Sequence, residues 1–387
     1  MPFIRNGSEG GGHTDTATTA LLIVEIILAW IILTAIQFPL RKEEHTILRP
    51  GIFLLKVILI SAVAVLAMGI EWVLPYIHGE ILCAVYIALI GDVVASVIEY
   101  IIRRIRAWRD VSDELRGRFD YRVGVSIGLA VCFAMLAFAA VNVETVRMDT
   151  HEWQADGLVQ EHTFAFAADL HTGSSMSMDS LREFCRQVND SDAEFLILGG
   201  DVTDELTPYG DMVETYAILS TVEIPVYLIY GNHDRQSRAD FVGGRTYTDE
   251  QLLAAIDGAG ITLLTDDYVQ IASDLVLLGR EDISAGDARK DWSELVNPYD
   301  GALIVADHQP YDNEQLKIEK SALQLSGHTH AGQLWPLKFV YSVLGLPVYG
   351  EYSYPGTHLY VTPGASGWAL LLRTEAHSGW ELIMLYP

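Results

Sequence analysis

The first 150 residues contain four long apolar stretches separated by short polar segments. The stretches cover residues 20–40, 52–75, 81–102 and 123–143. Each is close to the roughly 20 residues that a helix needs to cross the hydrocarbon core of a bilayer. The pattern therefore predicts a four-transmembrane-helix bundle over residues 20–150. Residues 1–19 are polar and glycine-rich, and we expect them to form a disordered tail.

The pattern changes in the second part of the chain, where short apolar runs alternate with segments of helical periodicity. Such alternation is typical of an α/β domain. We expect strands at residues 164–168, 195–198, 226–230, 275–278, 303–306, 323–325 and 359–361. We expect helices at residues 178–188, 212–219 and 249–255. The predicted fold is therefore a membrane bundle followed by an α/β domain over residues 151–387.

Charge separates the two parts further. The net charge of the chain is -26, and residues 151–387 contribute -24 of it. Because affinity for nucleic acids rests mainly on Lys and Arg at phosphates, an acidic domain of this kind excludes a nucleic-acid partner. The three cysteines define neither a disulfide framework nor a thiolate metal site.

The basic residues of the membrane part predict its orientation. Ten Lys and Arg residues lie in the loops after the first and third stretches, whereas the other side has Arg5 and Arg147. Loops rich in Lys and Arg stay in the cytoplasm. We therefore expect an integral membrane protein with four spans, whose α/β domain lies outside the cytoplasm.

Four ionisable residues occur within the apolar stretches: Glu25, Lys56, Asp92 and Glu99. Lys56 and Glu99 are expected at a similar depth near the cytoplasmic ends of their helices, where they can pair. Ionisable residues are expensive in hydrocarbon and are often functional. A structural pairing and a transport pathway both remain open.

Polar residues follow the predicted strands of the α/β domain at their C-terminal ends, where open α/β sheets usually have their sites. The five segments are Asp169-Leu170-His171, Gly200 to Asp204, Gly231 to Asp234, Asp307-His308 and Gly327 to Gln333. The last contains His328 and His330, and such a pair occurs both on surface turns and in metal sites. Asp, Asn and His without thiolates suit Mn, Fe, Zn or similar ions. Two such ions clamp the oxygens of a displacement at phosphorus, so the set predicts a dinuclear phosphoesterase.

The order D-x-H, G-D-x-x-D, G-N-H-D, a lone His and G-H-x-H resembles that of the calcineurin-like metallophosphoesterase superfamily. The form of the Gly327–Gln333 segment, together with an apolar N-terminal anchor, is similar to the membrane-anchored bacterial branch with a GHTHxGQ motif. The resemblance covers residues 160–387 and implies a calcineurin-like α/β sandwich.

The resemblance also implies roles for individual residues. It implies two divalent metal ions, the first bound by Asp169, His171 and His330, the second by Asn232, His308 and His328, with Asp201 as the bridge. It further implies a metal-bridging hydroxide as nucleophile. His233 would be the general acid or transition-state stabiliser, with Asp204 orienting its ring. Two departures stand out: Ala331 replaces a second glycine, and Glu205-Leu206 replace the phosphate-binding arginine of the protein phosphatases.

After this motif, residues 334–358 are rich in aromatic and apolar side chains. The segment either contacts lipid or is a packed excursion before the last predicted strand.

These observations favour a metal-dependent phosphoesterase acting on a phosphodiester, phosphomonoester or pyrophosphate. Its substrate is expected to be a phosphorylated small molecule or lipid of the envelope, outside the membrane. Three alternatives remain: a non-catalytic envelope-binding or signalling module, a four-helix transporter with an outer regulatory domain, and, with reversed topology, a cytoplasmic nucleotide-lipid pyrophosphatase.

Overall fold

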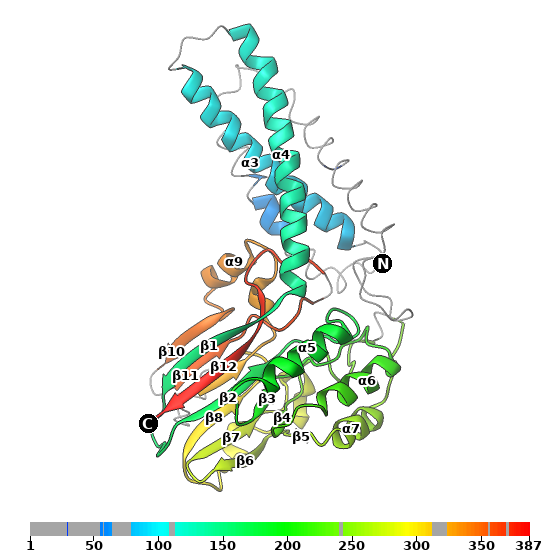
Figure 1. The fold of residues 1–387 in the computed structure, drawn as a ribbon, viewed down its shortest axis with the longest axis vertical. Helices are drawn as coiled ribbons and strands as arrows, with labels where there is room; N and C mark the ends of the chain where they lie inside the picture. Colours follow the sequence, from blue (N-terminus) through cyan, green and yellow to red (C-terminus); the bar gives the residue numbers. More distant parts are fainter. Residues whose placement is uncertain are drawn as a thin grey trace.

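Two long helices rise from a domain of sheets and shorter helices (Figure 1). They are α3 (Gly79–Ala107) and α4 (Asp113–Glu144). Each contains a segment long and apolar enough to cross a membrane, Ala84–Ile102 in α3 and Ser126–Glu144 in α4. The computed structural model describes residues 29, 55–56, 58–63, 79–107, 113–239, 243–311, 323–354, 357–368 and 371–387. The expected tail and most of the first two expected spans lie outside these residues.

An ion pair connects Lys56 to α3. Lys56 lies 2.6 Å from the carboxylate of Asp92 and donates to the hydroxyl of Ser96 at 3.1 Å. The expected partner of Lys56 was Glu99, whose side chain is outside the described residues. Asp92 lies seven residues, or about two turns, before Glu99 on the same helix face. The expected pairing with Glu99 thus lies outside the described residues, while Lys56 pairs with Asp92.

The first sheet contains six strands in the order β1-β12-β2-β3-β4-β5. The strands are β1 (Val146–Gln154), β2 (His162–Ala167), β3 (Leu196–Leu198), β4 (Val226–Leu228), β5 (Thr262–Leu263) and β12 (Ser378–Tyr386). β2 to β5 are parallel to one another, β12 is antiparallel to β2, and β1 is parallel to β12.

The second sheet also contains six strands, in the order β10-β11-β9-β8-β7-β6. The strands are β6 (Asp267–Ala272), β7 (Leu275–Gly279), β8 (Ala302–Ala306), β9 (Leu323–Ser326), β10 (Gly350–Tyr354) and β11 (Thr357–Val361). β7, β8, β9 and β11 are parallel. Because the central strands of each sheet run in one direction, their C-terminal ends gather at one edge.

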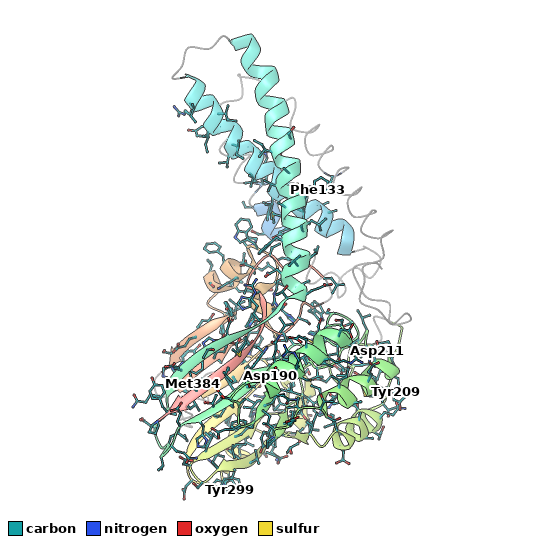
Figure 2. All side chains as sticks on the ribbon, in the orientation of Figure 1. Phe133, Asp190, Tyr209, Asp211, Tyr299 and Met384 are labelled. Carbon is teal, nitrogen blue, oxygen red and sulfur yellow. The ribbon has the colours of Figure 1, made fainter. Side chains whose placement is uncertain are left out.

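The two sheets pack face to face around a core of fully buried apolar side chains. Phe164 and Phe166 of the first sheet meet Leu277 and Ile304 of the second. On the outer face of the first sheet lie α5 (Met178–Asn189), α6 (Tyr209–Leu219) and α7 (Asp249–Gly258) (Figure 1). The short helix α9 (Leu337–Val343) lies beside the domain end of α4. Side chains fill the space between these layers (Figure 2).

All seven strands and three helices expected in the α/β domain are present, with ends that differ by a few residues. β1, β5, β6, β10 and β12 were not expected. β1 begins at Val146, two residues after α4 ends at Glu144. The sheet therefore begins within the segment that the sequence assigned to the membrane part.

Candidate metal centre

The structure brings the expected ligands together at the common edge of the two sheets. Asp169 and His171 follow β2, Asp201 follows β3, and Asn232 follows β4, while His308 follows β8 and His328 follows β9. His330 begins the short turn His330–Gly332. Residues from strands of both sheets thus meet at one place, as expected for parallel strands whose C-terminal ends share an edge.

The possible ligand atoms form two groups. Asp169, His171 and His330 form one, and Asp201, His308 and His328 form the other, with the atoms of each group within 4.8 Å of one another. The Oδ2 atom of Asp201 lies 3.0 Å from Nε2 of His308 and 3.8 Å from Nε2 of His171. One carboxylate oxygen therefore lies close to histidines of both groups.

Hydrogen bonds fix which nitrogen of three histidines faces the centre. The Nδ1 atoms of these rings point outward to oxygen acceptors. The acceptors are a carboxylate oxygen of Asp204 for His171 at 3.0 Å, the carbonyl of Gly199 for His308 at 2.8 Å and the carbonyl of Ser366 for His330 at 3.1 Å. Because a carbonyl or carboxylate oxygen accepts, each Nδ1 donates its hydrogen. Nε2 of each ring is then the atom that can bind a metal.

Bound cations explain the contacts at the centre better than hydrogen bonds between the side chains do. Nε2 of His171 and Nε2 of His330 face each other at 3.3 Å, although the tautomers above leave neither with a hydrogen to share. The side-chain amide of Asn232 is buried and has no hydrogen-bond partner within the described residues. Buried polar atoms without partners are costly. Nitrogen lone pairs and an amide oxygen are ligands that divalent transition metals accept.

The ligand residues also have strained backbones. Asp169, His171, Asp201, His328 and His330 have φ angles between 45° and 71°. Non-glycine residues rarely adopt this left-handed region, and each costs of order 1 to 2 kcal/mol. Clusters of such strain occur at functional sites, where the surrounding structure enforces them.

Two glycines leave room for the carboxylates. A Cβ atom at Gly231 would collide with Oδ1 of Asp201, and one at Gly327 would collide with Oδ2 of Asp169. Asp234 holds the loops of these two motifs together, because its carboxylate accepts hydrogen bonds from the backbone N–H groups of Asp201 and Gly231 at 2.8 and 2.7 Å. The glycines of the G-N-H-D and G-H-x-H motifs are therefore explained by close approach.

Burial and neighbouring charges set the protonation of the centre. Burial lowers the pKa of His328 to about 3, and burial also lowers the pKa of His330 well below its ordinary value. Both imidazoles are therefore neutral at neutral pH, as metal ligands must be. Burial opposes ionisation of Asp201, but His308 and His233 keep the pKa of its carboxyl well below the ordinary range.

His233 lies beside the two groups, but its partner is not the expected one. Nδ1 of His233 contacts Oε2 of Glu205 at 2.5 Å, and its ring packs against Trp368 with centroids 5.4 Å apart. Asp204, which was expected to orient this ring, instead accepts from His171 and also contacts the hydroxyl of Ser174. Asp204 therefore contacts the ring of a proposed ligand, and the carboxylate in contact with His233 is that of Glu205.

The sequence analysis missed three further residues near the centre. Glu205 and Trp368 contact His233, as described above. Arg373 is fully buried and donates to the carbonyl of His330 at 2.7 Å. Glu205 adjoins the G-D-x-x-D motif, and this was the only signal for it, whereas Trp368 and Arg373 lie in a segment without a recognisable motif.

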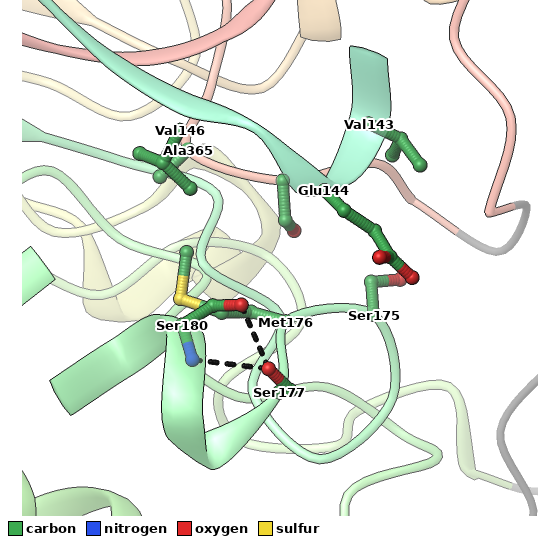
Figure 3. A pocket seen from close by; sticks show the side chains of 9 residues that line it. Val143, Glu144, Val146, Ser175, Met176, Ser177, Ser180 and Ala365 are labelled. Atoms are coloured by element: carbon green, nitrogen blue, oxygen red, sulfur yellow. Dashed lines mark hydrogen bonds between the residues drawn. The ribbon is translucent and has the colours of Figure 1, made fainter. Parts of the chain in front are cut away.

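A small pocket lies on the membrane side of the centre, where α4 meets the domain (Figure 3). Its lining includes Glu144, Ser175, Met176 and Ser366, and its volume is about 30 Å³. A site needs about 10 to 15 Å³ to admit a water molecule, so this pocket has room for a water or two but not for a substrate.

A two-sheet sandwich with paired Asp and His groups at the strand ends is the architecture of a metallophosphoesterase domain. Residues 162–332 match the model of the calcineurin-like phosphoesterase family. Over this segment the chain is similar to that family.

Several known proteins are similar to the chain. An "uncharacterized metallophosphoesterase" of Helicobacter pylori strain J99 is 27% identical over 247 residues, which are 60% of this chain and 62% of that protein. "Phosphodiesterase YaeI" of Escherichia coli K12 is 26% identical over 51% of this chain and 73% of that protein. A "transmembrane protein with metallophosphoesterase domain" of Danio rerio is 26% identical over 54% of this chain and 50% of that protein. The chain thus spans less than two thirds of the first and last of these relatives.

Proposed function

We propose that the protein is a metal-dependent phosphoesterase with two divalent cations at its centre. The proposed ligands are Asp169, His171 and His330 for one cation, Asn232, His308 and His328 for the other, and Asp201 for both. The observation that supports this best is the outward hydrogen bonding of three Nδ1 atoms, which leaves three Nε2 atoms beside two aspartates. The donor set suits Mn, Fe, Zn or similar ions.

When bound, the two cations would supply Lewis-acid activation of water and neutralisation of phosphate charge. The chain itself would supply a proton to the leaving group, from His233. Burial opposes protonation of His233, but the carboxylates of Asp201 and Glu205 raise its pKa to about 9. His233 is then protonated at neutral pH, with Nδ1 engaged by Glu205 and Nε2 available. As the bond between phosphorus and the leaving oxygen breaks, that oxygen takes the Nε2 proton.

The substrate is proposed to be a phosphodiester, phosphomonoester or pyrophosphate of a small molecule or of an envelope lipid. Glu205 and Leu206 replace the arginine with which related protein phosphatases bind phosphate, which disfavours phosphoprotein substrates. The charge of -24 on residues 151–387 disfavours nucleic acids. Homology to a named phosphodiesterase supports diester cleavage as the first activity to test.

The protein is proposed to have four spans and to expose this domain outside the cytoplasm. Ten basic residues in two loops, against two on the other side, support this orientation. Protease treatment of intact cells tests it: cleavage of the domain supports an outer location. Cleavage only after permeabilisation would favour the cytoplasmic nucleotide-lipid pyrophosphatase instead.

The enzymatic proposal is tested with the purified full chain in detergent, loaded with Mn²⁺ and assayed on bis(p-nitrophenyl) phosphate and p-nitrophenyl phosphate. Asp201→Asn is expected to lose both bound metal and activity. Asp257→Asn, an exposed change on α7, is the control and should retain both. Full activity in Asp201→Asn would refute the proposal, and metal binding without any turnover in the unchanged protein would favour the non-catalytic module.

A further inference from the structure

The segment from residue 333 to residue 348 leaves the centre and returns to it. It starts directly after the His330–Gly332 turn and contains α9. Where it returns, the carbonyl of Val348 accepts a hydrogen bond of 2.5 Å from the hydroxyl of Thr329. Thr329 lies between His328 and His330. Both ends of the segment are therefore attached to the turn that presents two proposed ligands.

One side of this segment packs against the membrane helices. Leu334 and Leu337 are buried, and Tyr341 packs beside them. They belong to one apolar cluster with residues of α3 and α4, including Ile87 and Ala139. Figure 1 shows α9 next to the domain end of α4. The segment is therefore part of the junction between α3, α4 and the domain.

Hydrogen bonds show how far along α4 the junction extends. The backbone N–H of Arg373 donates to the carbonyl of Ala139 at 3.0 Å, and the amide of Asn142 donates to the carbonyl of Arg373 at 3.2 Å. Ala139 lies five residues before Glu144, where the candidate span ends. At 1.5 Å per residue this is about 8 Å inside the span. The same apolar cluster includes Leu371 and Leu372, so the loop before Arg373 and α9 belong to one junction.

The other side of the segment is apolar and exposed. Phe339, Val343 and Leu344 are 68%, 70% and 66% exposed, and Trp335 and Leu346 are 43% and 40% exposed. Phe339 and Val343 are four residues apart and share one face of α9. Contiguous exposed apolar side chains mark contacts with proteins or membranes.

The exposed surface continues onto the membrane helices. On α4, Phe138 and Val141 are 54% and 65% exposed within the candidate span Ser126–Glu144. The segment also contains the residue types that favour a membrane interface, Trp335 and Lys338. This continuity with a membrane-spanning surface identifies the occupant, because a helix that crosses a bilayer is surrounded by lipid.

We propose that residues 335–346, here called the α9 rim, lie in the interfacial layer of the bilayer that surrounds α3 and α4. The partner is the phospholipid itself, with the apolar side chains of the rim among the upper acyl chains. Interfacial helices bury their apolar face about 5 to 10 Å into this layer.

The rim also suggests how a substrate arrives, and this step rests on the proposed function. Tyr311 packs its ring edge against His328 with centroids 5.7 Å apart. A rim in the interface would hold the centre near the headgroups, where the phosphate of a membrane lipid reaches it while its chains stay in the bilayer.

The test measures the depth of the rim in the full chain. Phe339→Cys, in a Cys83→Ser background, is labelled with bimane and reconstituted in liposomes of phosphatidylethanolamine and phosphatidylglycerol. Cys132 and Cys185 are buried. The control is Tyr299→Cys, because Tyr299 is exposed and lies at the end of the domain far from α3 and α4 (Figure 2). A second rim position, Val343→Cys, guards against a local effect of one label.

Brominated phosphatidylcholine is expected to quench the label at both rim positions at least about twofold and to leave the control unchanged. Equal quenching at residues 339 and 299 would overturn the proposal. Shielding of the rim from aqueous iodide that depends on protein concentration, without quenching by bromolipid, would assign the surface to a second copy and also overturn it.

Hydrolysis of bis(p-nitrophenyl) phosphate is measured in the same liposomes, so the two proposals fail separately. Lipid quenching without hydrolysis would leave the rim in place and remove the enzymatic function. Hydrolysis without lipid quenching would leave the enzymatic function in place and remove the interfacial position of the rim.

Discussion

Nδ1 of His233 lies 2.5 Å from Oε2 of Glu205, and this contact gives the ring a carboxylate partner that directly follows the G-D-x-x-D motif. Both side chains are more than 90% buried. The carboxylate fixes the ring orientation, so under the proposed function Glu205 is a positioning residue for a proton donor.

Glu205→Gln is therefore expected to lower kcat by about tenfold or more, since a positioned proton donor contributes about 10²-fold to 10⁴-fold. KM should change little, and the alkaline limb of the pH profile should move to lower pH because a stabilising charge is gone. Glu205→Asp should restore part of the rate. Unchanged kcat and pH profile in Glu205→Gln would show that this contact has no role in turnover.

Asp204→Asn should give a different result. Asp204 accepts from Nδ1 of His171, so its loss frees the ring of a proposed ligand. Second-layer partners of this kind change metal affinity by about 10-fold to 100-fold. Metal content after dialysis, measured by mass spectrometry, should fall in Asp204→Asn and stay normal in Glu205→Gln. Equal metal content in the two variants would contradict the division of roles between these carboxylates.

Gly231→Ala is expected to disable the centre, because the new Cβ collides with Oδ1 of Asp201. Gly258 at the end of α7 is the matched control, since a Cβ there meets no atom within 4 Å. Gly258→Ala should stabilise the domain slightly, by about 0.5 to 1 kcal/mol. Metal binding that survives in Gly231→Ala would mean that the β4 loop can move away from Asp201.

The Lys56 and Asp92 pair lies within the membrane helices, where a lone charge is costly. Lys56→Met alone should destabilise the protein by about 3 to 5 kcal/mol, because a buried charge then lacks its partner. Lys56→Met with Asp92→Asn should recover most of that loss. Unfolding in detergent provides the measurement, and strictly additive losses would show that the two residues do not interact.

The buried imidazole of His162 predicts a pH-dependent stability. It lies 2.9 Å from Glu194 and 3.1 Å from Asp274. Burial lowers its pKa, but the two carboxylates outweigh burial and raise it above 6.5. The stabilisation is therefore fully present below the unfolded pKa and is lost as pH rises through the folded pKa. Backbone N–H donors, led by that of Val159, and His162 lower the pKa of Asp274 to about 2, so its contribution disappears as pH falls from its ordinary pKa toward that value.

The free energy of unfolding lost in His162→Gln should thus be larger near about pH 6 than near about pH 9. The comparison is made by thermal unfolding of the full chain in detergent. A loss that grows with pH would mean that the neutral ring is the stabilised form.

The sequence predicted the central strands and helices because their apolar periodicity is strong and local. β1 and β12 were missed, since their pairing joins residues about 230 positions apart and neither has a motif beside it. The motif residues could be found because several chemically similar groups follow successive strands. The partner of His233 could not be found in this way, because Asp204 and Glu205 are adjacent carboxylates. Only the direction of the backbone decides that Asp204 faces His171 and that Glu205 faces His233.

The junction of α4 and β1 has a mechanical consequence. A single residue, Thr145, separates them, and both its N–H and its hydroxyl bond to the carbonyl of Val141. Such a joint has no slack, so the domain cannot swing out to collect substrates from solution as a module on a long linker would. Any tilt of α4 in response to bilayer thickness would instead be transmitted to β1 at the edge of the first sheet. Membrane composition would then influence the geometry of the domain.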